Sequence, residues 1–217
     1  SQFGNIASIA GINLPGGSED KSATYLAILT SRSFIEQYAV SRQIRPILFQ
    51  DMWDNARNAW INDVEPTAWQ TYQYVNENVT SVMTDRRTGL TTFSVFWSDP
   101  VVAAQWANNM IKDLNNHIRQ QAIEETESSI FFLEQQLEGT SQVNAQNVIY
   151  NLIEEQTKNI MLANVREEYA FKIIDPAIVP EIRVRPARRK IAIMGLLVGF
   201  LFGSLLALSK NYYDEHL

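Results

Sequence analysis

The sequence of 217 residues contains no cysteine and only two histidines. The lack of thiols excludes disulfides, thiolate zinc sites, iron–sulfur clusters and a cysteine nucleophile. Basic side chains are also scarce, since 18 of them face 24 acidic ones for a formal net charge of −6. A nucleic-acid-binding protein normally presents a basic face. We therefore expect no nucleic-acid partner.

The sequence also lacks the motifs of common catalytic sites. Neither His117 nor His216 has a second ligand at metal-site spacing, so both are expected to be ordinary surface residues. The carboxylates of Glu124, Glu125 and Glu127 could act as acid and base, but such a group on a long helix usually forms a solvated face. No phosphate-binding loop or nucleophile elbow occurs. We expect no enzymatic activity, no cofactor and no metal.

One long run of residues carries no charge. It covers residues 191–209, IAIMGLLVGFLFGSLLALS, and follows a segment, Arg183–Lys190, that holds five of the 18 basic residues. A helix over this run would be about 28 Å long, close to the hydrocarbon thickness of a bilayer. The alternative, a fully buried helix, would need a larger soluble core than this chain can form. The sequence therefore predicts a transmembrane helix over residues 191–209.

Glycines recur at every fourth position within this predicted span. Gly195, Gly199 and Gly203 lie on one helix face, and Ala207 continues the row. Missing side chains on one face allow another helix to approach closely, so the row predicts tight helix–helix packing. The alternative is that glycine is simply common in membrane helices.

The N-terminal half predicts a mixed α and β structure. Residues 1–21 are rich in glycine and indicate a loop, and a helix with an apolar stripe is expected from Ser22, which would cap it. Two β-strands are predicted at 79–85 and 90–98, with Gly89 at the turn. Aromatic side chains over residues 50–78 fit either a sugar-binding platform or burial in a core. They are Trp53, Trp60, Trp69, Tyr72 and Tyr74.

The longest predicted helix begins after Asp99 and runs from Pro100 to Glu138. It would be about 58 Å long, which is too long for a compact domain of this size, so it needs partners and favours oligomerisation. A second helix is predicted over 142–168, folded back on the first because only Gly139–Ser141 separate them. A strand is then expected over Tyr169–Asp175.

The approach to the predicted span is marked by three spaced prolines. Pro176, Pro180 and Pro186 are expected to hold this segment extended, because proline cannot continue a helix.

The order of these features resembles the Wzz-type chain-length determinants, also called polysaccharide co-polymerases. The resemblance covers nearly the whole chain. It rests on the small-residue segment 6–12, the helix with LAILTSRSF at 26–34, Asp99-Pro100 before a long helix, YAFKIIDPA at 169–177, the spaced prolines and the final span.

The resemblance implies an inner-membrane protein with two spans, both termini in the cytoplasm and a periplasmic α/β domain with a long helix. It further implies a ring-shaped homo-oligomer that sets the length of O antigen or a related glycan, together with a separate polymerase acting on lipid-linked polysaccharide. We expect an N-terminal span to be missing from this chain. The positive-inside rule alone would place Arg183–Lys190 in the cytoplasm, but the family's topology places it outside, and we adopt the latter.

The expected fold class is α+β with a protruding helix pair and a C-terminal transmembrane helix. The expected parts are a membrane-proximal α/β part (1–99), a helical excursion (100–168), a returning strand and neck (169–190), the span (191–209) and a short cytoplasmic tail (210–217). The predicted function is non-enzymatic control of surface polysaccharide chain length, at the bacterial inner membrane with most of the chain in the periplasm. The alternatives are a polysaccharide-export adaptor for a separate tyrosine kinase and a membrane-tethered glycan hydrolase.

Overall fold

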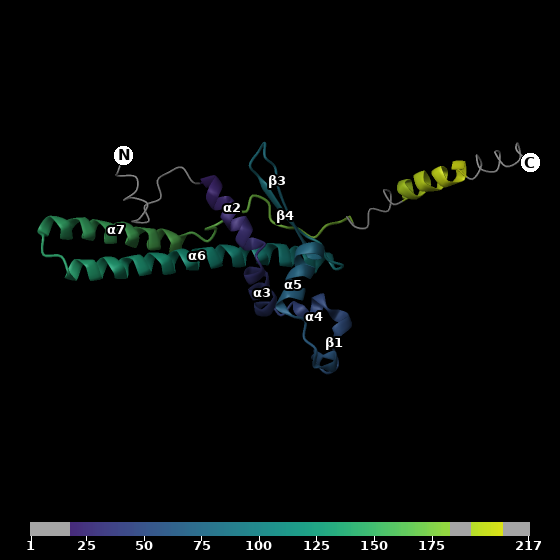
Figure 1. The fold of residues 1–217 in the computed structure, drawn as a ribbon, viewed down its shortest axis with the longest axis horizontal. Helices are drawn as coiled ribbons and strands as arrows, with labels where there is room; N and C mark the ends of the chain where they lie inside the picture. Colours follow the sequence, from purple (N-terminus) through teal and green to yellow (C-terminus); the bar gives the residue numbers. More distant parts are fainter. Residues whose placement is uncertain (1–17, 183–191, 206–217) are drawn as a thin grey trace, which may run out of the picture. The chain divides into compact units, whose positions relative to one another are not determined.

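The computed structural model describes residues 18–182 and 192–205, and the chain divides into two units, residues 1–178 and 179–217. The first unit is a mixed α and β structure rich in helix, with two small antiparallel sheets, as the sequence predicts (Figure 1). The predictions for residues 1–17, Pro186, Ala207 and the tail 210–217 lie outside the described residues.

The single helix predicted from Ser22 is in fact two helices, α2 (Ser18–Leu29) and α3 (Arg32–Ser41). The helix begins before Ser22, so the predicted cap is wrong. The break follows from local hydrogen bonding by two hydroxyls. Thr30 Oγ1 donates to the Leu26 carbonyl oxygen at 3.0 Å, and Ser31 Oγ accepts from the Phe34 amide as the N-cap of α3. Short polar side chains of this kind compete with the helix ladder.

The aromatic segment forms several short elements instead of one platform. Thr67 and Gln70 form a capping box that starts α5, because each side chain satisfies the other's backbone amide. The elements are α4 (Arg45–Leu48), η1 (Gln50–Met52), β1 (Trp53–Asp54), β2 (Ala59–Trp60), η2 (Ile61–Asp63), α5 (Ala68–Tyr74) and the π-helical turn η3 (Val75–Val79).

The predicted β-hairpin is confirmed. Strand β3 (Thr80–Thr84) pairs antiparallel with β4 (Thr91–Val95), and the register places Thr80 opposite Val95. Gly89 in the connecting turn has a φ of +70°, a left-handed conformation that glycine adopts without steric cost.

The longest helix, α6, spans Pro100–Glu138 as predicted. Asp99 caps it, since its Oδ1 accepts hydrogen bonds from the amides of Val101 (2.8 Å) and Val102 (3.4 Å). Helix α7 (Val143–Val165) folds back antiparallel along α6, and it ends three residues before the predicted boundary at 168 (Figure 1).

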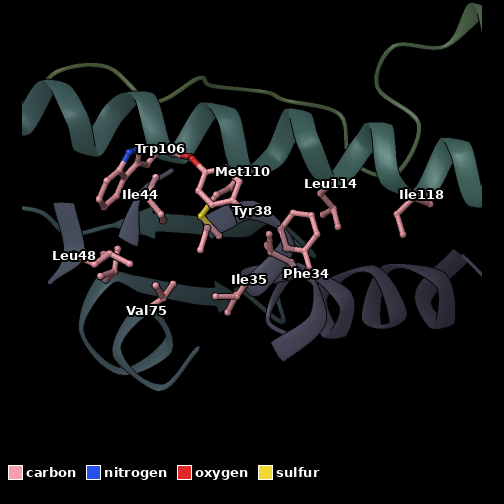
Figure 2. Close-up of a cluster of buried hydrophobic side chains, with 13 residues drawn as sticks. Phe34, Ile35, Tyr38, Ile44, Leu48, Val75, Trp106, Met110, Leu114 and Ile118 are labelled. Carbon is pink, nitrogen blue, oxygen red and sulfur yellow. The ribbon is translucent and has the colours of Figure 1, made fainter. Parts of the chain in front are cut away.

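The hydrophobic core lies between α3 and the first half of α6. Figure 2 shows four side chains of α6 (Trp106, Met110, Leu114 and Ile118) pointing towards those of α3 and its neighbours. The Trp106 ring also packs on Trp97, with centroids 5.1 Å apart, which joins the end of the β-hairpin to this helix. The buried residues of α6 extend from Ala103 to Ile118, and after Ile118 α6 has no buried residue.

The strand predicted over 169–175 is wrong. Residues 166–178, which we call the return segment, have no regular secondary structure within the described chain. The return segment runs back along α6 (Figure 1), and its backbone pairs with side chains of that helix rather than with a neighbouring strand.

Residues 192–205 form a helix in the second unit. Of the helices that the structure describes, none has both the length and the apolar character needed to cross a membrane. The transmembrane helix predicted over 191–209 is therefore not confirmed, and residues 191 and 206–209 lie outside the described part.

The core makes a direct prediction for Leu114, which is fully buried on α6. The substitution Leu114→Ala should lower the free energy of unfolding by ~2–5 kcal/mol, because it removes apolar contacts and leaves a cavity. Urea unfolding of the full chain in detergent, followed by tryptophan fluorescence, measures this loss. Leu90→Ala is the matched control, since Leu90 is 51% exposed, and an equal loss in both variants would contradict the assignment of the core.

Candidate functional site: the return segment and the helical hairpin

Asn115 of α6 holds the start of the return segment. Its side chain is 3% exposed, Nδ2 donates to the Phe171 carbonyl oxygen at 3.0 Å, and Oδ1 accepts from the amides of Ala170 (2.7 Å) and Phe171 (2.8 Å). One amide side chain thus forms hydrogen bonds to three backbone groups, in the place of the backbone of a neighbouring β-strand. Because buried backbone groups need partners, this contact fixes the segment on the helix.

Asn108 makes a second contact of the same kind, seven residues earlier on α6. Its Nδ2 donates to the Ala177 carbonyl oxygen at 2.8 Å, and its Oδ1 accepts from the Ala177 amide at 2.9 Å. Seven residues are about two helical turns, so both asparagines lie on one face. We call Asn108 and Asn115 the asparagine brackets; they hold the return segment antiparallel to α6.

Aromatic packing reinforces the first bracket. The rings of Tyr25 and Phe171 meet edge to face with centroids 6.0 Å apart, which joins α2 to the return segment. Burial raises the pKa of the Tyr25 phenol, and the nearby Tyr169 and Glu125 raise it further. The phenol is therefore neutral at ordinary pH and packs without the cost of a buried charge.

The predicted proline motif begins inside the return segment, where Pro176 directly precedes Ala177. Pro176 and Pro180 are exposed and lie in non-helical chain, whereas Pro186 is outside the described residues. Their role in holding the neck extended stays a prediction.

The predicted glycine row lies on the helix 192–205. A Cβ atom added at Gly195, Gly199 or Gly203 would meet nothing within 4 Å, so the row is an open face. Ala207 lies outside the described residues. The contact of this row with another helix stays a prediction.

The hairpin of α6 and α7 exposes many apolar side chains beyond the core. Ala163 is the one buried residue of α7 in the structure, so α7 covers α6 without being covered itself. The exposed apolar set is Phe131, Phe132, Val143, Val148, Tyr150, Met161, Leu162 and Val165, each more than half exposed. A soluble monomer rarely leaves such an extended apolar surface without a partner.

The candidate acid–base residues do not converge on a cleft. Glu124, Glu125 and Glu127 are exposed, as expected of a solvated helix face, and Glu124 and Glu125 accept hydrogen bonds from glutamines one turn earlier. His117 differs from the prediction of an ordinary surface residue. It is half-buried, and its ring lies against that of Phe34 with centroids 6.2 Å apart. His216 is outside the described residues.

The aromatic residues of 50–78 pack mainly on one another. The Trp53 and Trp60 rings meet edge to face at a centroid distance of 4.8 Å and join β1 to β2. Trp69 packs on Tyr72 but remains 55% exposed. The other four aromatic residues are half-buried, which favours packing over an open platform, and Trp69 is the most exposed of the five.

Comparison with protein families concerns the C-terminal part of the chain. Residues 133–212 match the GNVR model, a G-rich domain on putative tyrosine kinase. These residues are similar to that domain. The match covers less than half of the chain and supports, in this part, the resemblance to polysaccharide co-polymerases. Comparison with curated proteins finds no similar sequence.

The GNVR match includes the end of α6, all of α7, the return segment and the helix 192–205. The matched residues contain four glycines, three of which form the row described above. Both asparagine brackets lie outside the match, in the first half of α6, yet they hold residues inside it. The sequence signal that could have identified them is a pair of asparagines seven residues apart, adjoining the apolar stripe of the longest helix.

The first bracket predicts the behaviour of Asn115→Leu, which keeps a similar volume but removes all three hydrogen bonds. Each buried polar group left unpaired costs ~1–3 kcal/mol, so the return segment should detach locally. Hydrogen exchange measured by mass spectrometry should become ~10-fold faster or more at the amides of Ala170 and Phe171. Asn116→Leu is the control because Asn116 is exposed on the same helix. Unchanged exchange in a folded Asn115→Leu variant would refute the bracket.

Proposed function

We propose that this chain is a non-catalytic regulator of bacterial surface polysaccharide chain length, acting on O antigen or a related glycan. The GNVR match carries this proposal, because it includes three features of the resemblance to the polysaccharide co-polymerases, namely the segment 169–177, the spaced prolines and the predicted final span. The bracketed return segment gives that part a defined position on α6.

The helical hairpin supports assembly as a homo-oligomer. The second half of α6 lies beyond the core, and it shares with α7 an exposed apolar surface that includes Phe131, Phe132 and Met161. Burying apolar surface is the main driving force of association. Copies packed side by side through their hairpins would cover this surface, and a closed ring is the arrangement that leaves no copy with an uncovered side.

The proposed location is the bacterial inner membrane, with most of the chain in the periplasm. The uncharged run 191–209 and the basic segment before it support a C-terminal span. The open row of Gly195, Gly199 and Gly203 would then pack against an upstream span or against the glycan polymerase. The partners in this proposal are therefore that polymerase and its lipid-linked polysaccharide.

The glycan length profile of a deletion strain tests the proposal. Loss of the gene should change a modal ladder of glycan lengths on a gel into a random one, and the full-length gene should restore the mode. An unchanged ladder would overturn the proposed function.

Within that strain, the gene carrying Gly199→Leu should fail to restore the mode, because the leucine side chain would hold the neighbouring helix away. Leu201→Phe is the control, since residue 201 lies on the opposite side of the helix and also gains bulk. The subunit count from mass measurement in detergent shows whether each variant still assembles. Restoration by Gly199→Leu as complete as by the control would contradict the packing role of the row.

A second candidate is an adaptor for polysaccharide export that works with a separate tyrosine kinase. The observation that favours it is the description of the matched family, a domain found on putative tyrosine kinases. In that case deletion should reduce the total polymer on the cell surface without shifting its length distribution, so the same deletion strain separates the two candidates.

The enzymatic alternative, a tethered glycan hydrolase, makes a different prediction for the carboxylates of α6. Glycosidases need a pair of carboxyl groups that flank the scissile bond. The triple substitution of Glu124, Glu125 and Glu127 by glutamine should leave the modal ladder intact if the protein is a scaffold. Loss of the mode, in a variant that is expressed and assembled like the parent, would instead support hydrolysis.

A further inference from the structure

A cleft lined by residues with polar groups lies between α3 and the middle of α6, away from the return segment's hydrogen bonds to α6. Its volume is about 480 Å³, within the range of ~300–1,000 Å³ that is usual for small-molecule sites. We call it the α3–α6 cleft. Its walls include Gln37, Tyr38 and Arg42 from the α3 side and Asp113, His117 and Gln120 from α6.

A closed ion pair forms one wall of the α3–α6 cleft. Arg42 donates from Nε to Asp113 Oδ2 at 2.9 Å and from Nη2 to Asp113 Oδ1 at 2.7 Å. This two-point contact fixes both planar groups and neutralises their charges against each other. Among the residues that the structure describes, no lysine and no second arginine lines the cleft. A phosphate or other anion would therefore find little net positive charge, and the cleft is better suited to a neutral polar ligand.

Other side chains that line the cleft have donor or acceptor atoms that a ligand could use. The side chains of Gln37 and His117 make no hydrogen bond to any residue that the structure describes. Gln120 uses its Nε2 to donate to Glu124, which leaves its carbonyl oxygen open. The cleft thus presents both donors and acceptors on planar side chains. A ligand with many hydroxyl groups, each both donor and acceptor, matches this mixture.

Two rings supply the apolar part of the wall. Tyr38 is buried and donates its hydroxyl to the Trp106 carbonyl oxygen at 3.5 Å, and the His117 ring is steadied by its contact with Phe34. Burial, with the negative charge of Asp113, raises the pKa of the Tyr38 phenol, so this wall stays neutral. Rings held in place in this way can pack against the C–H faces of a sugar.

We propose that the α3–α6 cleft binds a neutral sugar unit through hydrogen bonds from Gln37, His117 and Gln120. The proposal rests on the proposed function for the source of that sugar, namely the polysaccharide whose length is regulated. It differs from that function in placing a direct glycan contact in the first unit, at a site distinct from the hairpin surface and the glycine row.

Saturation-transfer NMR on the full chain in detergent tests the proposal. The probes are the methyl glycosides of glucose, galactose, rhamnose and N-acetylglucosamine, with inorganic phosphate as an anionic competitor. We expect transfer to at least one glycoside, and phosphate should not compete. No transfer to any of the four, or displacement of the bound glycoside by phosphate, would overturn the proposal.

Variants locate the binding. Gln37→Ala should weaken it by ~3–10-fold, as the loss of one hydrogen bond implies, and this exposed residue can be changed without disturbing the core. His117→Ala should weaken it further, with thermal unfolding as the check on folding. Gln73→Ala, an exposed glutamine of α5, is the matched control. Equal binding by Gln37→Ala and the control would refute the site.

The two proposals fail separately. An unchanged glycan ladder in the deletion strain removes the proposed function, whatever the NMR result. A random ladder in that strain, combined with no glycoside binding, removes the cleft as a sugar site and leaves chain-length control standing.

Discussion

The burial of one stripe of α6 constrains the rest of the structure. The helix is 39 residues long, yet its buried residues extend from Ala103 to Ile118 alone. The first half forms a wall of the core, against α3 and the π-helical turn, and fixes the direction of the whole rod. Its second half then extends beyond the core, and α7 packs along it (Figure 1). The exposed apolar side chains of the hairpin are a direct consequence of this geometry.

The asparagine brackets provide hydrogen-bond partners for the backbone of the return segment, which follows the long hairpin. After α7 ends, the chain continues along the first half of α6 without a strand to pair with, and its backbone groups still need partners. Asn115 and Asn108 supply them from one face of the helix. The first half of α6 therefore positions both the core and the return segment, and the return segment lies within the GNVR match.

The elements that the sequence predicts correctly are marked by signals within a few neighbouring residues. Asp99-Pro100 marks the start of α6, and the alternation around Phe93 with Gly89 marks the β-hairpin. The break at Thr30-Ser31 was missed because the apolar spacing of helices α2 and α3 continues across it. The false strand arose because an extended segment looks the same in sequence whether its backbone pairs with a strand or with side-chain amides. The α3–α6 cleft was beyond sequence reasoning, since Arg42 and Asp113 are 71 positions apart and only the fold joins them.

The different faces of α6 bring these features together on one rigid element. Its apolar stripe faces the core, the asparagine brackets face the return segment, and Asp113, His117 and Gln120 face the cleft. The cleft at His117 and the exposed ring of Phe131 are about 20 Å apart along the helix axis. A continuous helix can hold a bound sugar at a fixed distance from the hairpin surface. Binding in the cleft cannot change the hairpin surface, however, unless some element between them has two conformations. If the cleft binds sugar, the role of α6 is to keep the glycan-binding cleft and the subunit-contacting hairpin surface at a constant distance from each other.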